Sequence, residues 1–551
     1  MKVPIAIAAA GAAATLALAP TTSQARSLYR QHGASRLLSI ASATAVAIQP
    51  DGKIVAGGRR SGVGDTGDPA ESADFALARY KPNGRLDPSF GAQGRVLTDF
   101  GLTYDWLEAL VLQPDGKIVA GGSSSPPSQH GDSVFALARY DSRGRLDPSF
   151  GRHGKVRVRL GPSQSAAYAL ALQPDGKVIA AGANYGYDDA TLPSWVVARF
   201  NANGSLDRSF GNGGEVTTAF GPMSVAGAVT LDPSGKVVVL GSSCYSGDEG
   251  ACVLAVARYN ADGSLDPSFG SGGKVTTQFE GFEVVRGNGV AVQADGKIVA
   301  AGTAGSDVSD NYNFVLAGYN ADGSVDSGFG TGGTVMTDFE PGNDDESHDF
   351  ASGLALEPDG AVVVAGTDSN EHFAVALYDA HGSLDPSFGG TGFVQTELTG
   401  EDEARAVAIA RDGKIVTAGL AGEGRFVLVR YRRDGGLDQD FGKAGSVFTA
   451  FGSPVTVVTS FSAADMDRGD LIRWRTAVEV NARGFNVYRD YRGHRVRVNR
   501  KLVPSKGSSA RGASYSFFDK AAPPHGELRY LLQVVKQDGR RVWYTAAVPE
   551  R

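Results

Sequence analysis

The sequence predicts an all-β chain whose larger part is a ring of seven similar units. Two short markers recur in step seven times, about sixty residues apart. A fixed period of this length is typical of solenoids, arrays and propellers. One marker is a variant of Leu-Asp-Pro-Ser-Phe-Gly, whose phenylalanines are Phe90, Phe150, Phe210, Phe269, Phe329, Phe388 and Phe441. The other is Pro-Asp-Gly-Lys or a close relative, whose glycines are Gly52, Gly116, Gly176, Gly235, Gly296, Gly360 and Gly413.

Each repeat predicts four short antiparallel strands. In the copy Gln293–Phe339, apolar runs of four to seven residues alternate with Gly, Asn and Asp clusters, a pattern typical of strands and tight turns. The Asp-Gly of the first turn supplies the positive φ angles that a hairpin needs, and Asn260–Gly263 does the same for the third-to-fourth connection. No segment of useful length has helical periodicity.

Seven copies of a four-stranded antiparallel unit, joined by short links, predict a seven-bladed β-propeller over residues 41–452. An open β-solenoid is the alternative, although its coils are usually shorter than sixty residues. Residues 26–40 are a linker or a ring-sealing strand, because Ser35–Ile40 resembles a fourth strand. The last copy nevertheless carries its own candidate fourth strand, Ser446–Thr449.

The repeat also points to a family. The residues LQPDGKIVAGG, FALARY and NGRLDPSFGAQGRVLTDF resemble the delta-60 repeat of bacterial secreted and surface proteins. The resemblance covers residues 41–452 in all seven copies. It implies an extracellular, propeller-like module, and it implies no general chemistry.

The N-terminus predicts export. Lys2, an apolar stretch over 3–19 and Ser23-Gln24-Ala25 are typical of a signal peptide spanning residues 1–25, cut after Ala25. A retained N-terminal anchor is the alternative. No other segment is apolar and long enough to span a membrane. We expect a bacterial protein that is secreted or located at the cell surface or in the periplasm.

The two cysteines, Cys244 and Cys252, bracket a loop between the second and third strands of the fourth copy. In an oxidising compartment this pair predicts a disulfide. A metal pair is the alternative, but no histidine lies nearby.

The repeat ends at Gly452, and residues 453–551 have a different composition. They hold 18 Lys and Arg against 9 Asp and Glu, a net charge of +9, whereas the whole chain has a net charge of −7. Strand-like runs alternate here, and Leu471–Arg489 resembles fibronectin type III-like modules of exported bacterial proteins. The resemblance implies a small β-sandwich, with Trp474 buried on an early strand and Tyr530 on a late one. Its charge predicts salt-dependent contact with anionic envelope polymers.

Motifs with catalytic chemistry are absent from the sequence. The eight histidines are scattered, and no nucleophile elbow, phosphate loop or dinucleotide turn is present. Asn260, Asp262 and Asp266 have the spacing of a calcium-loop start. Other copies lose this pattern, so Asx-capped turns are favoured over calcium, and we expect neither a metal nor a cofactor. The sequence favours a non-enzymatic protein that binds no nucleic acid.

The variable loops are the predicted binding surface. The two markers occupy turns on one face of the ring, whereas nearly all length variation falls on the other face, where function usually lies. These loops combine aromatic and acidic residues, and we expect them to bind a protein partner or a polysaccharide. A solvated acidic rim is the alternative reading. Two further hypotheses are a structural cell-surface adhesin and a glycan hydrolase or lyase with paired carboxylates near the axis. The candidate ligand residues are Tyr185, Tyr187, Asp188, Asp189, Tyr245, Asp248, Glu249, Asp307, Asp310 and Tyr312.

Overall fold

The chain folds into two compact units, Met1–Ala450 and Phe451–Arg551, and every regular element that the structure describes is a β-strand. Among the described residues, no helix is long and apolar enough to cross a membrane. The computed structural model describes residues 41–550 except 63–71, 102–103, 127–132, 162–163, 186–192, 245–251, 307–310, 341–346, 423, 452–456, 467, 479–481, 492–493, 507–512, 524–527, 537–540 and 548.

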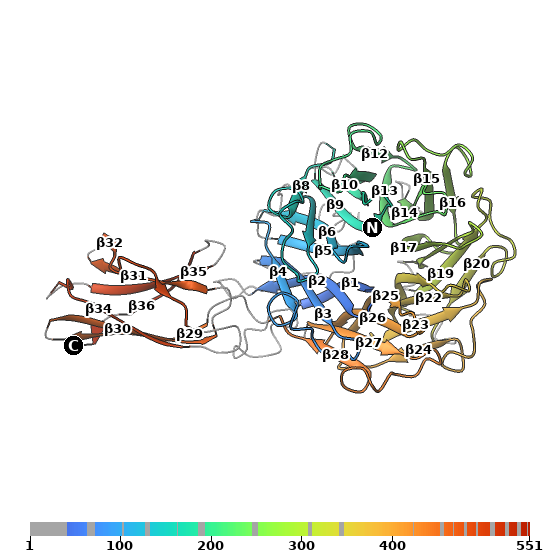
Figure 1. Cartoon of the computed structure of the whole chain (residues 1–551). Coiled ribbons are helices and arrows are strands. Elements are labelled where there is room, and N and C mark those ends of the chain that lie inside the picture. Colours follow the sequence, from blue (N-terminus) through green and yellow to red (C-terminus); the bar gives the residue numbers. More distant parts are fainter. Residues whose placement is uncertain are drawn as a thin grey trace, which may run out of the picture. The chain divides into compact units, whose positions relative to one another are not determined.

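The first unit is the predicted seven-bladed β-propeller (Figure 1). Each blade has four antiparallel strands in sequence order, and a parallel bridge between Ala73 and Tyr104 joins the sheets of blades one and two. The innermost strands of neighbouring blades contact one another around the axis. The innermost strands are β1 (Ala41–Ile48), β5 (Tyr104–Leu112), β9 (Gln164–Leu172), β13 (Met223–Leu231), β17 (Val284–Val292), β21 (Phe350–Leu356) and β25 (Asp402–Ile409). The second strands are β2 (Ile54–Gly62), β6 (Ile118–Ser125), β10 (Val178–Tyr185), β14 (Val237–Cys244), β18 (Ile298–Ser306), β22 (Val362–Thr367) and β26 (Ile415–Ala421).

The outer half of each blade holds the third and fourth strands. The third strands are β3 (Ser72–Tyr80), β7 (Val134–Tyr140), β11 (Ser194–Phe200), β15 (Cys252–Tyr259), β19 (Asn311–Tyr319), β23 (Phe373–Tyr378) and β27 (Arg425–Tyr431). The fourth strands, four residues each, are β4 (Arg95–Thr98), β8 (Lys155–Val158), β12 (Glu215–Thr218), β16 (Lys274–Thr277), β20 (Thr334–Thr337), β24 (Phe393–Thr396) and β28 (Ser446–Thr449).

The ring closes by packing between blades one and seven. Blade seven takes all four strands, β25 to β28, from its own repeat, and β1 packs against β25 and β26. Hydrogen bonds join the two blades from Ala41 N to Gly424 O at 2.8 Å and from Gly442 N to Asn83 O at 2.9 Å. The predicted sealing strand, residues 35–40, lies outside the described residues.

Apolar cores fill the spaces between blades. The recurring phenylalanine is at most 2% exposed in every copy, and Phe90, for example, packs among β2, β3 and the first two strands of blade two. The recurring phenylalanine therefore fills the space between neighbouring blades. Such close-packed interfaces are stabilised by apolar burial and dispersion.

An arginine at the end of the third strand joins each such phenylalanine to the next blade. In blade one, Arg79 Nε donates to Asp87 Oδ2 at 3.0 Å, and its guanidinium lies 4.7 Å from the Phe90 ring centroid. Its Nη1 donates to the carbonyl of Ser142, in the third turn of blade two, at 2.6 Å. Arg139, Arg199, Arg258 and Arg430 make the same three contacts in their own copies, and Arg430 reaches the Pro82 carbonyl of blade one. We call this contact the arginine latch.

The two sequence markers meet at this latch. Asp266, from the Leu-Asp-Pro-Ser-Phe-Gly marker, accepts from Arg258 Nε and pairs with Lys236 of the other marker, both at 2.7 Å. The same Lys–Asp pair recurs in four other copies, at 2.8–3.5 Å. The markers therefore recur together because their side chains share one ion-pair network.

Blades five and six replace the latch. Gly318 in blade five and Leu377 in blade six occupy the position at which the other five copies have arginine. In blade five, Gln293 Nε2 reaches the Ala380 carbonyl at 3.4 Å, the atom that corresponds to Ser142 O. In blade six, Glu357 pairs with Arg433 of the next blade at 2.8 Å. In both blades, the residue before the Ala-Asp-Gly or Pro-Asp-Gly turn thus makes the contact between blades where arginine is missing.

A tyrosine–threonine hydrogen bond links the blades at a second point. The hydroxyl of Tyr259, at the end of β15, lies 2.7 Å from Thr218 Oγ1 at the end of β12. Tyr80, Tyr140, Tyr319, Tyr378 and Tyr431 make the same bond at 2.6–3.0 Å. Blade three has Phe200 in place of tyrosine, and the corresponding residue of blade two is Val158 in place of threonine. Both polar partners are therefore replaced together, which leaves no buried hydroxyl unpaired.

The second unit is a β-sandwich of two sheets, as predicted. Trp474 and Tyr530 are buried in its core, which matches the predicted positions, and Tyr530 donates to Asp470 at 2.9 Å. One sheet has the order β34 (Ser514–Asp519), β30 (Gly469–Val478), β29 (Val457–Met466) and β37 (Pro549–Glu550). The other has the order β32 (His494–Arg497), β31 (Ala482–Tyr491), β35 (Leu528–Lys536) and β36 (Arg541–Ala547), with β33 (Val503–Pro504) beside β31.

The tyrosine–threonine pair gives a testable expectation. Tyr259→Phe leaves the buried Thr218 hydroxyl unpaired and should lower the free energy of unfolding by about 1–3 kcal/mol. Adding Thr218→Val reproduces the Phe200–Val158 arrangement and should restore most of that loss, because removing both partners leaves no unsatisfied group. Urea denaturation followed by tryptophan fluorescence measures both effects. A double variant as unstable as the sum of the two single variants would contradict this account.

Candidate binding cavity on the propeller axis

Every innermost strand carries a β-bulge at the same place. In β1, Ala43 pairs with Gly58 and Ala45 with Gly57, so Thr44 has no partner in the ladder. The other six blades show the same register shift. A bulge changes the direction of a side chain. The side chains of these residues therefore depart from the normal alternation of side chains between the two faces of a strand. The seven bulged residues are Thr44, Glu108, Tyr168, Gly227, Asn288, Ser352 and Arg405.

A glycine in the second strand makes each bulge possible. A Cβ on Gly122 would lie 1.8 Å from the Trp106 carbonyl oxygen, and the glycines at this position in all seven blades would clash at 1.8–2.0 Å. The backbone of the innermost strand therefore occupies the space of a side chain. This explains why one glycine of each second strand is constant: Gly58, Gly122, Gly182, Gly241, Gly302, Gly366 and Gly419.

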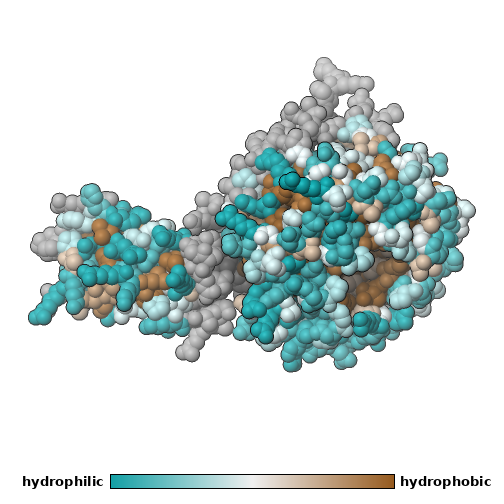
Figure 2. Space-filling view, turned by 45° about the horizontal axis from the view of Figure 1, so that its top comes forward, coloured by the Kyte–Doolittle hydropathy of each residue, from teal (hydrophilic) through white to brown (hydrophobic). Residues whose placement is uncertain are grey.

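All seven bulged residues line one cavity of about 350 Å³ on the axis. Small-molecule sites typically have volumes of this order. The lining residues come from the innermost strands and, for Arg59 and Ser242, from the second strands close to where the second-to-third loops leave. The cavity therefore lies toward the face with the variable loops. Apolar residues are visible in the hollowed middle of the ring (Figure 2).

Charged groups gather on the side of the cavity formed by blades one, two and seven. The guanidinium of Arg59 lies 4.8 Å from the Trp106 ring centroid, and Arg405 Nε donates to Glu403 at 2.9 Å. Burial and the nearby Arg405 lower the pKa of Arg59 to about 10, against the opposing effect of Glu108 and Glu403. Burial also raises the pKa of Glu108, although Arg59 and Arg405 oppose this shift. The group is a desolvated network in which cations and carboxylates lie close together.

Tyr168 extends this polar wall into blade three. Its hydroxyl lies 2.5 Å from that of Tyr185 on the adjacent strand β10. Burial raises the pKa of Tyr168 well above its usual value and that of Tyr185 to about 12. Both phenols therefore stay protonated at neutral pH, and Tyr168 can offer a hydroxyl to a ligand.

Arg286 faces the cavity from blade five. Its Nε is buried without a hydrogen-bond partner, and Arg286 has no ion pair within the part of the chain that the structure describes. Its neighbour Asn288 uses Nδ2 to donate to the Ala351 carbonyl of blade six at 2.7 Å. Since buried polar groups are normally paired, Arg286 is the member of the wall with unused capacity for an anion.

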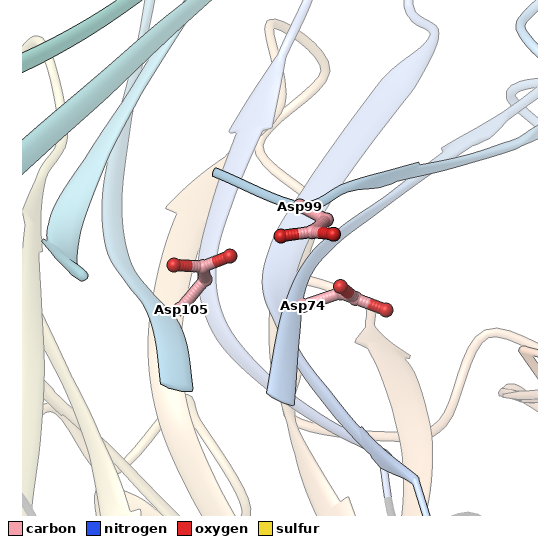
Figure 3. Close-up of side chains that lie close together, drawn as sticks. All are labelled: Asp74, Asp99 and Asp105. Carbon is pink, nitrogen blue, oxygen red and sulfur yellow. The ribbon is translucent and has the colours of Figure 1, made fainter. Parts of the chain in front are cut away.

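A separate acidic cluster lies between blades one and two. Asp74, Asp99 and Asp105 have carboxylate oxygens within 4.8 Å of one another, and their side chains converge (Figure 3). Asp74 lies 3.7 Å from Arg60 Nη1, so a cation of the chain is already beside the cluster. Burial raises the pKa of Asp105 to about 7, and Asp99 and Asp74 add to the shift.

The backbone explains the position of Asp105. Its carboxylate accepts hydrogen bonds from Phe100 N at 2.7 Å and from Ser124 Oγ at 2.5 Å. These bonds hold the segment that connects β4 of blade one to β5 of blade two. Asp349 and Asp402, the corresponding residues of blades six and seven, accept in the same way from Phe339 N at 3.0 Å and Leu398 N at 2.7 Å. A role that recurs in three blades is structural, and we assign no metal to this cluster.

The predicted ligand residues fall mostly on segments that the structure does not describe. Tyr185 supports the cavity through Tyr168, as above. Tyr312 is 7% exposed and packs against Phe350, with ring centroids 5.1 Å apart. The loop surface therefore stays a prediction. Outside the described residues lie Tyr187, Asp188, Asp189, Tyr245, Asp248, Glu249, Asp307 and Asp310.

Two other predictions have clear outcomes. Cys244 and Cys252 form the predicted disulfide. At the calcium-like turns, the carboxylate of Asp262 accepts from Ser264, and Asp266 is held by arginine and lysine as described above. These are the contacts expected for Asx-capped turns.

Sequence reasoning overlooked the bulged residues, although a signal was present. Each lies fourteen residues before the constant glycine of the second strand, in all seven copies. Six of the seven are polar or charged within a strand that otherwise reads as mainly apolar. An alignment of the copies by that glycine would have revealed a position with seven different residues.

The fold and the cavity define a β-propeller repeat protein with a chemically asymmetric axial site. Seven segments match the model of the domain of unknown function (DUF5122) beta-propeller, so the chain carries seven DUF5122 beta-propeller repeats. The delta-60 resemblance stays a prediction. A comparison with curated protein sequences finds no match. The matched segments are residues 49–90, 113–150, 173–210, 233–269, 293–329, 357–388 and 410–441.

Solved structures with a similar fold are distant in sequence. The acylaminoacyl peptidase of Pyrococcus horikoshii is 9% identical with a TM-score of 0.37, over 81% of this chain and 59% of the peptidase. The chain therefore spans less than two thirds of that protein. The polysaccharide lyase Uly1 is 10% identical with a TM-score of 0.36, over 77% of this chain and 92% of the lyase. The β-propeller domain of the Trilobed protease from Pyrococcus furiosus is 11% identical with a TM-score of 0.31, over 72% and 96%. None of them carries an argument about activity.

The raised pKa of Asp105 gives a pH-dependent expectation. Between about pH 4 and 7 the folded protein holds a proton that the unfolded chain has released, so this group's stabilisation is largest below pH 4 and is lost as pH rises to 7. Asp105→Asn should remove that decline, worth a few kcal/mol at most, since one pKa unit corresponds to ~1.4 kcal/mol. Denaturation at a series of pH values measures it.

Asp147 provides the control with the opposite sign. Despite burial, bonds from Ser149 and the nearby Arg139 lower its pKa to about 2, so its stabilisation is present above pH 4 and lost as pH falls toward 2. Asp147→Asn should therefore lower stability at pH 7 and have little effect near pH 2. An unchanged slope between pH 4 and 7 in Asp105→Asn would contradict the assignment.

Proposed function

We propose that this chain is an exported, non-enzymatic binding protein whose propeller takes an acidic sugar residue of a polysaccharide into the axial cavity. The observation that carries the proposal is the composition of the cavity wall. Three guanidinium groups line it, from Arg59, Arg286 and Arg405, against one lining carboxylate, Glu108. A cavity with excess cationic charge and low solvent access favours an anion.

The ligand class follows from the geometry of these groups. A guanidinium presents a planar fork that matches a carboxylate bidentately. Tyr168, Asn288 and Ser352 add hydroxyl and amide groups on the same wall, which suit the hydroxyls of a sugar. The volume of about 350 Å³ is sufficient for a small sugar unit, not for a folded protein segment.

The proposal also covers the location of the protein and the role of its C-terminal sandwich. We place the chain in the secreted, surface or periplasmic fraction on the basis of the signal peptide predicted for residues 1–25. The fibronectin type III-like sandwich would serve as a spacer or an attachment module. A hydrolase or lyase with paired carboxylates receives less support, because Glu108 is the one carboxylate among the described lining residues and Glu403 is already paired with Arg405.

Binding of an acidic oligosaccharide by the full chain tests the proposal. Isothermal titration with trigalacturonate should show binding that is lost with its methyl ester, which has the same shape without charge. Arg286→Gln should raise Kd by about ten- to a hundredfold, since a charge-assisted hydrogen bond contributes ~1.5–3 kcal/mol. Arg157→Gln, the same change on the exposed outer strand β8, should leave Kd within about twofold.

Two results would overturn the proposal. One is equal affinity for the acid and its methyl ester, and the other is an unchanged Kd in Arg286→Gln. Shortening of the trigalacturonate during incubation, abolished by Glu108→Gln, would favour the enzymatic alternative.

A further inference from the structure

The outward face of one sandwich sheet has an unusual composition. In the sheet β32-β31-β35-β36, residues directly opposite each other on neighbouring strands share a face. Phe485, Val487, Leu532 and Val534 point into the core. The register places the intervening residues on the opposite, outward face: Asn486, Tyr488, Asp490, Arg495, Arg497, Arg529, Leu531, Gln533, Val535, Arg541 and Trp543.

Two aromatic rings form the centre of this face. The rings of Tyr488 and Trp543 lie with centroids 4.7 Å apart, and the Arg495 guanidinium lies 5.0 Å from the Trp543 ring. Beneath them, Asn486 Nδ2 donates to Gln533 Oε1 at 3.0 Å, and Tyr488 donates to the same oxygen at 3.3 Å. The rings are therefore held in place, although Trp543 remains 41% exposed.

Cationic groups surround the rings. Arg495, Arg497, Arg529 and Arg541 lie on this face, and Asp490 is the one carboxylate among its described residues. Asp490 lies 3.9 Å from Arg495 and 3.5 Å from Arg529. The side chains of Arg495 and Arg529 stay 47% and 59% exposed in these pairs. One acid cannot neutralise four guanidinium groups, so the described residues of this face carry a net positive charge and exposed donors.

We propose that this aromatic–arginine face binds an acidic polysaccharide, independently of the axial cavity. The guanidinium groups match carboxylates or sulfates spaced along a polymer, and the exposed indole offers an apolar surface to a sugar ring. The arrangement fits a polymer better than a bilayer, because Trp543 is packed between Tyr488 and Arg495 rather than free to insert. If the axial cavity also binds acidic sugar residues, as proposed above, the sandwich and the propeller bind the same polymer.

The test uses the full chain carrying Arg286→Gln, so that the axial cavity contributes little. Immobilised polygalacturonate should retain this protein at low ionic strength and release it as salt rises, whereas neutral dextran should not retain it. Adding Arg495→Gln and Arg497→Gln should weaken binding about tenfold or more.

The opposite face of the sandwich supplies the matched control. Arg473 and Arg475 are exposed on β30, whose outward neighbours are serines rather than aromatic residues. Changing both to Gln removes the same charge and should alter binding less than about twofold. Equal losses in the two pairs would overturn the proposal in favour of bulk charge. Tighter binding to vesicles of anionic phospholipid than to polygalacturonate would overturn it in favour of a membrane surface.

Discussion

The close approach of two backbones inside each blade is the constraint on which the axial site depends. The carbonyl oxygen of the innermost strand lies where the Cβ of any other residue would stand, so the second strand must have glycine there. That approach accompanies the bulge, and the bulge turns one side chain per blade toward the axis. Seven glycines, which contribute no chemistry, thereby determine where the chemistry of the cavity can lie.

The ring needs a second kind of constraint, because sheets that only pack face to face can slide. The arginine latch and the tyrosine–threonine bond are directional, and both join a blade to its neighbour at the outer strands. Removing one partner of such a buried pair is costly, whereas replacing both is nearly neutral. Phe200 with Val158 is an instance of the second case. Blades one and seven are joined by both contacts, Arg430 to the Pro82 carbonyl and Tyr80 to Thr449, and among the described residues no strand is exchanged between them.

The sequence was sufficient to predict the propeller, the sandwich and the disulfide, because period, turn chemistry and cysteine position depend on local residues. It was insufficient for the axial site. Glu108 and Arg405 are almost three hundred residues apart in the chain, and nothing local shows that they share a wall. A bulge also breaks the alternation from which the direction of a side chain is normally read, so Glu108 and Tyr168 looked like ordinary strand residues. The loops were easier to notice because they differ among the copies in length as well as in residue type.

Seven copies of one unit allow the chain to be compared with itself. Positions that the packing requires are nearly constant among the copies: the glycine, the phenylalanine and the aspartate of the latch. The bulged position is equally fixed in its backbone, yet it carries Thr, Glu, Tyr, Gly, Asn, Ser and Arg in turn. Backbone geometry cannot account for seven different side chains at one equivalent place. A ligand without sevenfold symmetry, which meets each blade with a different group, would account for them.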